Sequence, residues 1–388
     1  MISWQDMIRA VRAVSRLHPD SNRKRFLFGF FDREVPWEQL ILLAESEGVD
    51  GLLYHHLCGL GVPSVPEAIM ERLKKNHERN IRQEEELRKE AEFISAILDY
   101  NGLSAVALQG LSLNRIYVVP GLRSMGDLDL LIKTNEHASV VSLLKKIGFR
   151  IPNSVYPNNL FKNFIWLDLH THVLNLDRIR SRRYLFPEDL SPLWGCALPL
   201  FGSSRGILKP DPLDNLVLLS AHTLKHGYSR MIWLVDLYES ILSIGSQPAG
   251  WKKLVERVRL WRQEKVVIYG LSILEGVLGL NIPEWVKREL NFCDMRGIER
   301  YLIKLRIEGV VLPEYSVLFS FFAIPCFKER LLFLIESIFP KEDVMLQIYS
   351  NSPVGSRSAR ILRRLTQSVN MAGNGLKQAL AHGLFGNR

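Results

Sequence analysis

Two aspartates separated by one residue open an apolar run in the middle of this chain. Asp127 and Asp129 begin the segment 127–133, directly after a glycine-containing loop that carries Arg123. Because side chains alternate between the two faces of a strand, both carboxylates are expected on the same face. Two like charges side by side repel each other unless a cation or a proton separates them. The pair therefore indicates either two solvated acids at a strand edge or a divalent metal site of the kind that serves phosphate chemistry.

The composition is that of a folded protein with a large core. Of the 388 residues, 47% are hydrophobic and 23% are charged, which excludes general disorder. The formal net charge of +9 suits anionic partners such as nucleotides, nucleic acid or a lipid surface, without selecting among them. The four cysteines lie far apart, which favours reduced core residues over a disulfide framework or a zinc site. They are Cys58, Cys196, Cys293 and Cys326.

No transmembrane segment is expected. The most apolar stretch, residues 317–324, ends at Pro325 and is shorter than the roughly 18 to 20 residues that a spanning helix needs. A buried helix pair is favoured here over a peripheral membrane helix. The first residues lack the basic segment and apolar core of a signal peptide, so a cytoplasmic location is expected.

The spacing of hydrophobic residues divides the sequence into regions that predict different secondary structure. Residues 1–100 carry apolar residues at helical spacing, whereas short apolar runs separated by turn residues follow over 101–205. Helical spacing returns over 206–350, starting at the Asp211-Pro212 pair, and 351–388 is expected to form a basic, partly flexible tail. We therefore predict an α+β protein that is mostly helical, with a small α/β core between N-terminal and C-terminal helical regions.

The elements expected around the α/β core can be placed from turn residues and spacing. The expected elements are a helix over 66–100, a strand over 105–108, a helix over 111–118, a strand over 127–133, a helix over 135–147, one or two strands within 161–174, and helices over 212–227 and 229–244.

A glycine and a serine follow the first expected strand. Gly110 comes just after the strand, and Ser112 lies in the first turn of the helix expected over 111–118. Backbone N–H groups at a helix N-terminus bind phosphate, and glycine lets a phosphate approach closely. This order predicts a phosphate-binding turn beside the paired aspartates. The alternative is that Ser112 is an ordinary hydrogen-bonding residue of the helix.

These segments together resemble the nucleotidyltransferases of the polymerase-beta superfamily, and are closest to the bacterial group called uncharacterised nucleotidyltransferase. The similarity is carried by Leu-Gln-Gly at 108–110 and by Gly-Leu-Arg-Ser-Met-Gly-Asp-Leu-Asp-Leu-Leu at 121–131. It continues in Trp-Leu-Asp-Leu-His at 166–170 and, less specifically, over residues 214–237. The chain has Gln109 where the group often has lysine, which removes one phosphate contact, and Ser124 where it often has proline.

The resemblance implies a polymerase-beta-like core with a mixed sheet and a metal-dependent transfer of a nucleoside monophosphate from a nucleoside triphosphate to an acceptor, with release of pyrophosphate. By the same resemblance, Asp127 and Asp129 hold two Mg²⁺ (or Mn²⁺) ions, and Asp168 is the candidate third ligand that helps deprotonate the attacking hydroxyl. A structural role for Asp168 beside an arginine is the alternative. The implied nucleotide-binding residues are Gly110, Ser112 and Arg123. A plain ion pair with a nearby acid is the alternative for Arg123.

Three histidines are candidate pocket residues. Asp168, His170 and His172 alternate, so we expect them on one face, with His170 flanking the pocket of Asp168. His222 and His226 are four residues apart on one helix, a spacing that zinc can use. A buried pair lining the active cleft is favoured over a metal site for these two.

The sequence leaves the acceptor, the base of the nucleotide and the oligomeric state open. Small molecules, peptides, carbohydrates and RNA are all possible acceptors, and the basic tail is a candidate RNA contact. One alternative function is a non-catalytic nucleotide- or RNA-binding protein on the same fold, and another is a tRNA-directed, toxin-like nucleotidyltransferase. The like-charge pair and Arg123 favour an enzyme, because a degenerate site has no need of them.

Overall fold

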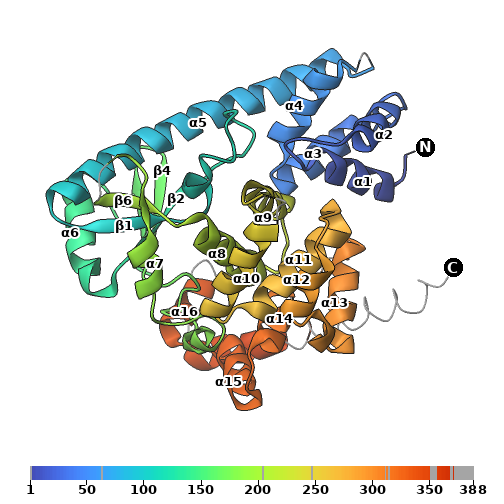
Figure 1. Cartoon of the computed structure of the whole chain (residues 1–388). Helices are drawn as coiled ribbons and strands as arrows, with labels where there is room; N and C mark the ends of the chain where they lie inside the picture. The colour runs from blue at the N-terminus through green and yellow to red at the C-terminus, as the bar shows by residue number, and fades with distance from the viewer. Residues whose placement is uncertain are drawn as a thin grey trace.

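Helices form the N-terminal part of the chain in the computed structural model, which describes residues 2–62, 64–202, 205–245, 248–310, 312, 315–349, 356–367 and 370. The first helix starts with a reciprocal cap, in which Ser3 accepts from the backbone of Asp6 and Asp6 accepts from that of Ser3. The expected long helix is present and runs along the sheet (Figure 1). These helices are α1 (Trp4–Val14), α2 (Ser21–Phe31), α3 (Trp37–Glu47), α4 (Asp50–Leu60) and α5 (Glu67–Tyr100).

A six-stranded mixed sheet follows, in the order β3-β4-β2-β1-β6-β5. The central strand β2 pairs in parallel with β4 and antiparallel with β1, and β1 pairs in parallel with β6. The predicted α+β class, mostly helical with a mixed sheet, is confirmed. The strands are β1 (Ser104–Ala107), β2 (Asp127–Ile132), β3 (Asn159–Lys162), β4 (Ile165–His170), β5 (Leu198–Pro199) and β6 (Gly206–Lys209).

The two faces of the sheet have different partners. Leu128 and Leu130 of β2 pack in one core with residues of α5 and of α6 (His137–Lys146), which cover that face. Leu131 points the other way, into a larger core that the sheet shares with the N-terminal and C-terminal helices. Because alternate residues of a strand share a face, Asp127 and Asp129 lie on the face directed toward the C-terminal helices.

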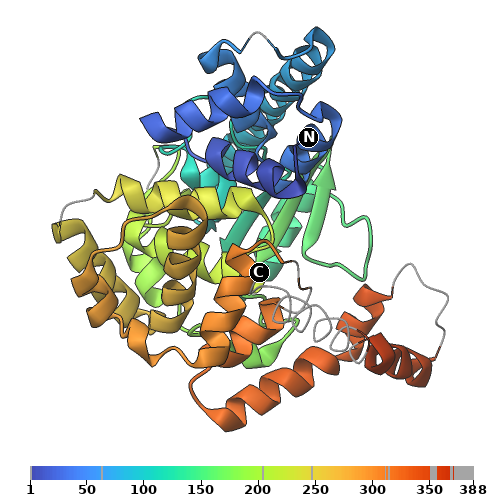
Figure 2. The same cartoon turned by 90° about the vertical axis from the view of Figure 1, so that its right-hand side faces the viewer.

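The C-terminal helices begin where the Asp211-Pro212 pair predicts. The Asp211 side chain accepts from the N–H of Leu213, and Pro212 is the first residue of α8. The helices after the sheet are α8 (Pro212–Lys225), α9 (Met231–Ser243), α10 (Pro248–Leu260), α11 (Glu264–Leu278), α12 (Glu284–Glu289), α13 (Gly297–Ile307), α14 (Tyr315–Ala323), α15 (Phe327–Ile338) and α16 (Glu342–Ile348). The last two, orange-red to red in Figure 2, lie at the periphery. Between β4 and β6 are η3 (Arg180–Tyr184) and α7 (Ser191–Cys196).

Two local expectations are wrong. The helix expected over 111–118 is replaced by a single 3-10 helix, η1 (Gln109–Leu113), because β-branched residues follow and Pro120 prevents continuation. The cysteines are free but exposed rather than buried in the core, since they lie on the solvent side of short helices or at helix ends. The division of the chain at residues 100, 205 and 350 stays a prediction.

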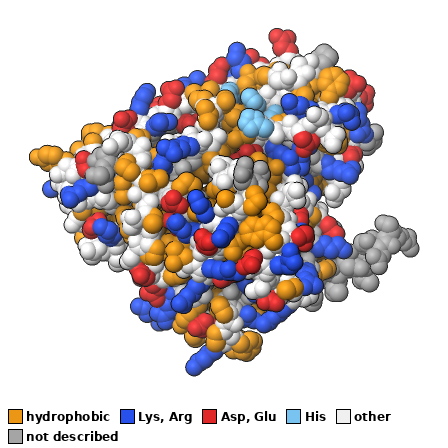
Figure 3. All heavy atoms as spheres, viewed as in Figure 1, with side chains coloured by type: hydrophobic (Ala, Val, Ile, Leu, Met, Phe, Trp, Pro, Cys, Tyr) orange, Lys and Arg blue, Asp and Glu red, His pale blue; other side chains and the backbone are white. Residues whose placement is uncertain are grey.

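Two further observations concern the surface and the end of the chain. None of the helices in the described ranges is long and apolar enough to cross a membrane. Residues 357–367 of the basic tail are helical, whereas 351–355, 368–369 and 371–388 lie outside the described residues. On the face shown in Figure 3, basic and acidic side chains are interspersed, so the net positive charge forms no single basic patch there.

Candidate functional site

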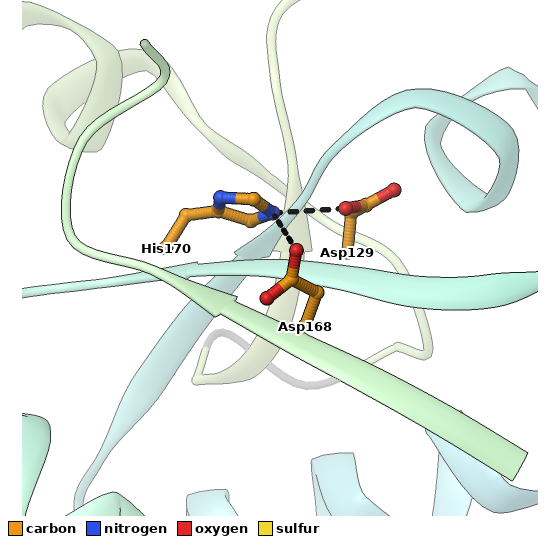
Figure 4. Close-up of side chains that lie close together, drawn as sticks. All are labelled: Asp129, Asp168 and His170. Atoms are coloured by element: carbon orange, nitrogen blue, oxygen red, sulfur yellow. Dashed lines mark hydrogen bonds and ion pairs between the residues drawn. The ribbon is translucent and has the colours of Figure 1, made fainter. Parts of the chain in front are cut away.

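The parallel pairing of β2 with β4 brings two carboxylates and an imidazole together. Asp129 lies opposite Asp168 in the register of the two strands, and His170 follows two residues later on β4. His170 Nε2 lies 2.8 Å from Asp129 Oδ1 and 3.5 Å from Asp168 Oδ2, so the three side chains converge (Figure 4). One ligand atom from each lies within 4.8 Å of the others. Carboxylate oxygens suit Mg²⁺ and Mn²⁺, and imidazole is tolerated by Mn²⁺ and other transition metals.

Asp127 lies beside this cluster rather than within it. It is exposed at the first position of β2, on the same face as Asp129. Desolvation by the surrounding protein, together with the negative charges of Asp129 and Asp168, raises the pKa of Asp127 to about 6. Burial and the charge of Asp129 likewise raise the pKa of Asp168, against the effect of His170. A divalent cation would relieve this repulsion, so the donor set fits a metal centre.

A hydrogen-bonded chain connects His170 to a lysine of α8. Asn175 Oδ1 accepts from Lys225 Nζ at 2.7 Å, which leaves Asn175 Nδ2 facing His170 Nδ1 at 3.3 Å. In this arrangement the imidazole proton is on Nε2, which faces Asp129. Burial alone would lower the pKa of His170, but the hydrogen bond and charge of Asp129 outweigh it and raise the pKa. A metal bound through Nε2 would have to displace this proton.

Cationic groups lie near the carboxylates. Burial and the charge of Arg182 lower the pKa of Lys225 to about 8, while Asp129 and Asp168 act in the opposite direction. Burial and the charge of Arg178 lower the pKa of Arg182 to about 10, and Arg182 Nη1 donates to the carbonyl of Leu174 at 2.9 Å. Several cationic side chains near a carboxylate cluster can bind a polyphosphate. Asn175 and Arg182 are not among the site residues predicted from the sequence. The arginine-rich run 178–183 does indicate positive charge in this part of the chain.

The paired histidines His222 and His226 pack against a tryptophan in tilted and edge-on geometry. The His222 and His226 ring centroids are 4.6 Å apart, and Trp233 of α9 lies 5.2 Å from the first and 4.6 Å from the second. Burial is the main cause that lowers the pKa of His222 well below its usual value and that of His226 to about 3, so both rings are neutral at pH 7. Among the described residues, no carboxylate or thiol joins them to complete a metal site. Neutral rings of this kind can stack on a planar ligand.

Arg123 forms a buried ion pair with Asp236. Its Nε and Nη2 each donate to Asp236 of α9 at 2.9 Å, and Tyr117 Oη donates to the same carboxylate at 2.7 Å. Burial opposes the charged form, but the charge of Asp236 outweighs it and raises the pKa of Arg123. The pair fixes the loop before β2 on α9. The phosphate contact expected of Arg123 stays a prediction.

Gly110 and Ser112 lie in η1, which borders β2. A Cβ at Gly110 would lie 2.6 Å from Arg123 Nη1, so glycine lets the arginine pack against the turn. Ser112 Oγ donates to the carbonyl of Gln109 at 2.6 Å and lies 3.2 Å from Asn215 Oδ1, as in the alternative interpretation of Ser112 as a local hydrogen-bonding residue. A 3-10 turn aligns fewer N–H groups than the helix expected here. Phosphate binding at these two residues stays a prediction.

His172 departs from the expected common face. It lies beyond the end of β4, where its Nε2 is 2.8 Å from the carbonyl of Pro187 and its Nδ1 accepts from the N–H of Leu174. The ring therefore supports the loop after β4 and is turned away from the cluster.

The segment that contains these residues matches a known family. The family model described as uncharacterised nucleotidyltransferase matches residues 33–279, which include β2, β4, α8 and α9. Comparison with curated proteins finds no match, and comparison with solved structures finds none either. The matched segment is more than half of the chain and holds every residue of the candidate site. The chain thus belongs to the uncharacterised nucleotidyltransferase family and is a nucleotidyltransferase.

Proposed function

We propose that the protein transfers a nucleoside monophosphate group from a nucleoside triphosphate to an acceptor hydroxyl, using divalent ions held by Asp127, Asp129 and Asp168. The observation that carries this proposal is the register of β2 and β4, which sets Asp129 opposite Asp168 with Asp127 on the same face. In the reaction, the acceptor oxygen bonds to the α-phosphorus, and the bond from that phosphorus to the oxygen bridging to the β-phosphate breaks. Pyrophosphate leaves, and the proton of the hydroxyl passes to Asp168.

Two features support Asp168 as the proton acceptor. Its carboxylate is partly buried, and its raised pKa brings its basicity closer to what a general base needs at neutral pH. Bound between the carboxylates, Mg²⁺ or Mn²⁺ would neutralise phosphate oxygens and acidify the attacking hydroxyl. His170 holds Asp129 by its hydrogen bond, so it positions that carboxylate in the metal-free protein.

The cationic side of the site supports binding of the triphosphate. Gln109 stands where the resembled group often has lysine, so a positive charge is missing from η1. Lys225 and Arg182 supply positive charge instead, and Lys225 is close enough to Asp129 for the carboxylate to affect the lysine's pKa. We expect these two cations to contact the β- and γ-phosphates. Asn175 keeps the Lys225 ammonium in place through its 2.7 Å hydrogen bond.

The cluster of aromatic rings supports binding of the base. His222, His226 and Trp233 form a neutral aromatic group next to Lys225, and the Nε2 of His222 is buried with no hydrogen-bond partner in the described chain. Because an unpaired buried nitrogen is costly, a partner for it would stabilise the site. A nucleobase offers both a ring to stack and a polar edge to hydrogen-bond. We therefore expect the base toward α8 and the phosphates toward the carboxylates.

Nucleotide binding tests the proposal without knowledge of the acceptor. Calorimetric titration of each nucleoside triphosphate should show binding that requires Mn²⁺ or Mg²⁺, and α-labelled nucleotide with candidate acceptors should show label transfer with pyrophosphate release. Asp127→Asn and Asp129→Asn should lose the metal-dependent binding while keeping the thermal midpoint within a few degrees. The matched control is Asp32→Asn, at an exposed aspartate that ends α2. Equal metal-dependent binding by Asp129→Asn and the control would refute the metal assignment.

A further inference from the structure

A cavity of about 640 Å³ lies between the edge of the sheet and the helices α8, α9 and α10, away from the carboxylate cluster. Lys209, the last residue of β6, lines it together with Ser112 of η1 and the ends of α9 and α10. In the sheet, β1 separates β6 from β2, which carries Asp127 and Asp129. The volume is in the range of small-molecule sites, which is roughly 300 to 1,000 Å³.

The cavity contains a buried lysine without an acidic partner. Lys209 is only 8% exposed, and its ammonium group has no hydrogen bond or ion pair in the described part of the chain. Burial and the nearby charge of Arg115 lower the pKa of Lys209. The ammonium group reaches the open space of the cavity, where no counter-charge meets it. An anionic ligand would supply that counter-charge.

The other charged groups around the cavity also favour an anion. Arg115 and Lys253 line it and, like Lys209, form no ion pair with any described acid. The one carboxylate in the lining, Asp211, is already engaged, since it caps α8 through the N–H of Leu213 and lies 3.6 Å from Arg257 Nη1. Three cations and one acid that already has its own partners line the cavity. This charge balance suits a ligand with more than one negative charge, such as a phosphate group.

The rest of the lining indicates the body of the ligand. Apolar side chains form much of the wall, and Asn215 adds a side-chain amide whose Oδ1 lies 3.2 Å from Ser112 Oγ. Inorganic phosphate alone would leave this apolar surface and most of the volume unfilled. An organic molecule that carries a phosphate fits both parts. The apolar residues are Ile116, Leu198, Leu213 and Ile244.

We propose that this cavity is a second ligand site, which binds a small phosphorylated organic molecule through Lys209 and Arg115. The proposal does not rest on the nucleotidyl-transfer mechanism, because Asp127, Asp129, Asp168 and Lys225 do not line the cavity. Of the nucleotide-binding residues that the family resemblance implies, Ser112 lines it and Gly110 and Arg123 do not. Lys209 is the central group, since it is the buried one. Arg115 and Lys253 are exposed and add charge at the mouth.

Thermal unfolding with phosphate as the probe tests the site. With EDTA present and ionic strength held constant with chloride, inorganic phosphate and glycerol 3-phosphate should raise the thermal midpoint of the wild type, glycerol 3-phosphate by more. Lys209→Met should abolish both shifts, whereas the matched control Lys252→Met, at an exposed neighbouring lysine on α10, should keep them. In the absence of phosphate, Lys209→Met should unfold at the same temperature as the wild type or above it, because no counter-charge is left without its partner.

The outcomes separate this site from the catalytic one. Asp129→Asn and Lys225→Met should keep the thermal shift that phosphate causes. Arg115→Gln should lower the apparent affinity for phosphate by about tenfold. It is the test variant to use if Lys209→Met does not fold. Loss of the shift in Lys225→Met but not in Lys209→Met would place the phosphate at the nucleotide site and overturn the proposal. The absence of any shift in the wild type, or an undiminished shift in both Lys209→Met and Arg115→Gln, would also overturn it.

Discussion

Asp129 and Asp168 lie opposite each other across the parallel pairing of β2 with β4, and His170 Nε2 contacts both carboxylates. A slip of one residue between the strands would turn one of these acids into the core, because side chains alternate at each step. The register is held by Leu128 and Leu167, which are buried beneath the sheet at the neighbouring position. The apolar core of the sheet therefore sets the geometry of the metal ligands.

Replacement of His170 should weaken metal binding without removing the carboxylates. His170→Ala leaves Asp129 without its hydrogen-bond partner, so we expect the Kd for Mn²⁺ to rise about 10- to 100-fold. Calorimetry or electron paramagnetic resonance of Mn²⁺ measures this. His55→Ala, at an exposed histidine of α4, is the control and should bind as the wild type does. Unchanged Mn²⁺ affinity in His170→Ala would show that the imidazole neither binds the metal nor orients Asp129.

Lys225 should affect nucleotide binding more than metal binding. Lys225→Met removes the ammonium group that Asn175 holds near the carboxylates, so we expect about 10- to 100-fold weaker binding of nucleoside triphosphate in Mn²⁺. The affinity for Mn²⁺ alone should be equal or slightly higher, because a nearby positive charge is lost. Titrations of the metal and of the nucleotide measure the two effects separately. A nucleoside with no phosphate should bind both proteins equally, and a loss there would contradict the phosphate role.

The ion pair between Arg123 and Asp236 should be a major contributor to stability. Both groups are buried, and Tyr117 shares the carboxylate, so Arg123→Met leaves a buried charge without its partner. We expect the free energy of unfolding to fall by about 3 to 5 kcal/mol. Urea unfolding measures it, with Glu71→Gln as the control, because its ion pair with Lys75 is exposed and contributes about 0 to 1 kcal/mol. A similar small loss in both variants would indicate that the pair is not stabilising.

The order of local elements around the site could be predicted from sequence because the signals there are local. The alternation in 127–133 and the cap pair Asp211-Pro212 correctly predicted β2 and the start of α8. The aspartate pair pointed to a cation for a physical reason, since like charges on one strand face need compensation.

Contacts between distant segments could not be predicted in the same way. The partner of Arg123 is 113 residues away along the chain, and Lys225 is 50 residues from Asn175. The local sequence around Arg123 or Lys225 therefore does not indicate which residue it contacts. The short strand β6 pairs in parallel with β1 about a hundred residues earlier, and its four residues are too few for a periodicity signal. The helix expected over 111–118 is absent because β-branched residues and Pro120 follow η1, whose first residue Gln109 has a positive φ of 53°.

Stability should decline as the pH falls below about 6.5, because the two histidines of α8 are held neutral. The pKa of His226 is about 3 in the folded protein, against about 6.5 in an unfolded chain. The unfolded state therefore binds more protons between these values, so each pH unit of acidification from 6.5 toward 3 costs up to about 1.4 kcal/mol through His226. His222, whose pKa is also lowered, adds to the effect.

We expect His226→Gln to lose about 1 kcal/mol less stability than the wild type between pH 7.5 and 5.5, measured by urea unfolding at both pH values. His18→Gln, at an exposed histidine, should lose stability as the wild type does. An equal pH dependence in His226→Gln would show that His226 is not buried as a neutral ring.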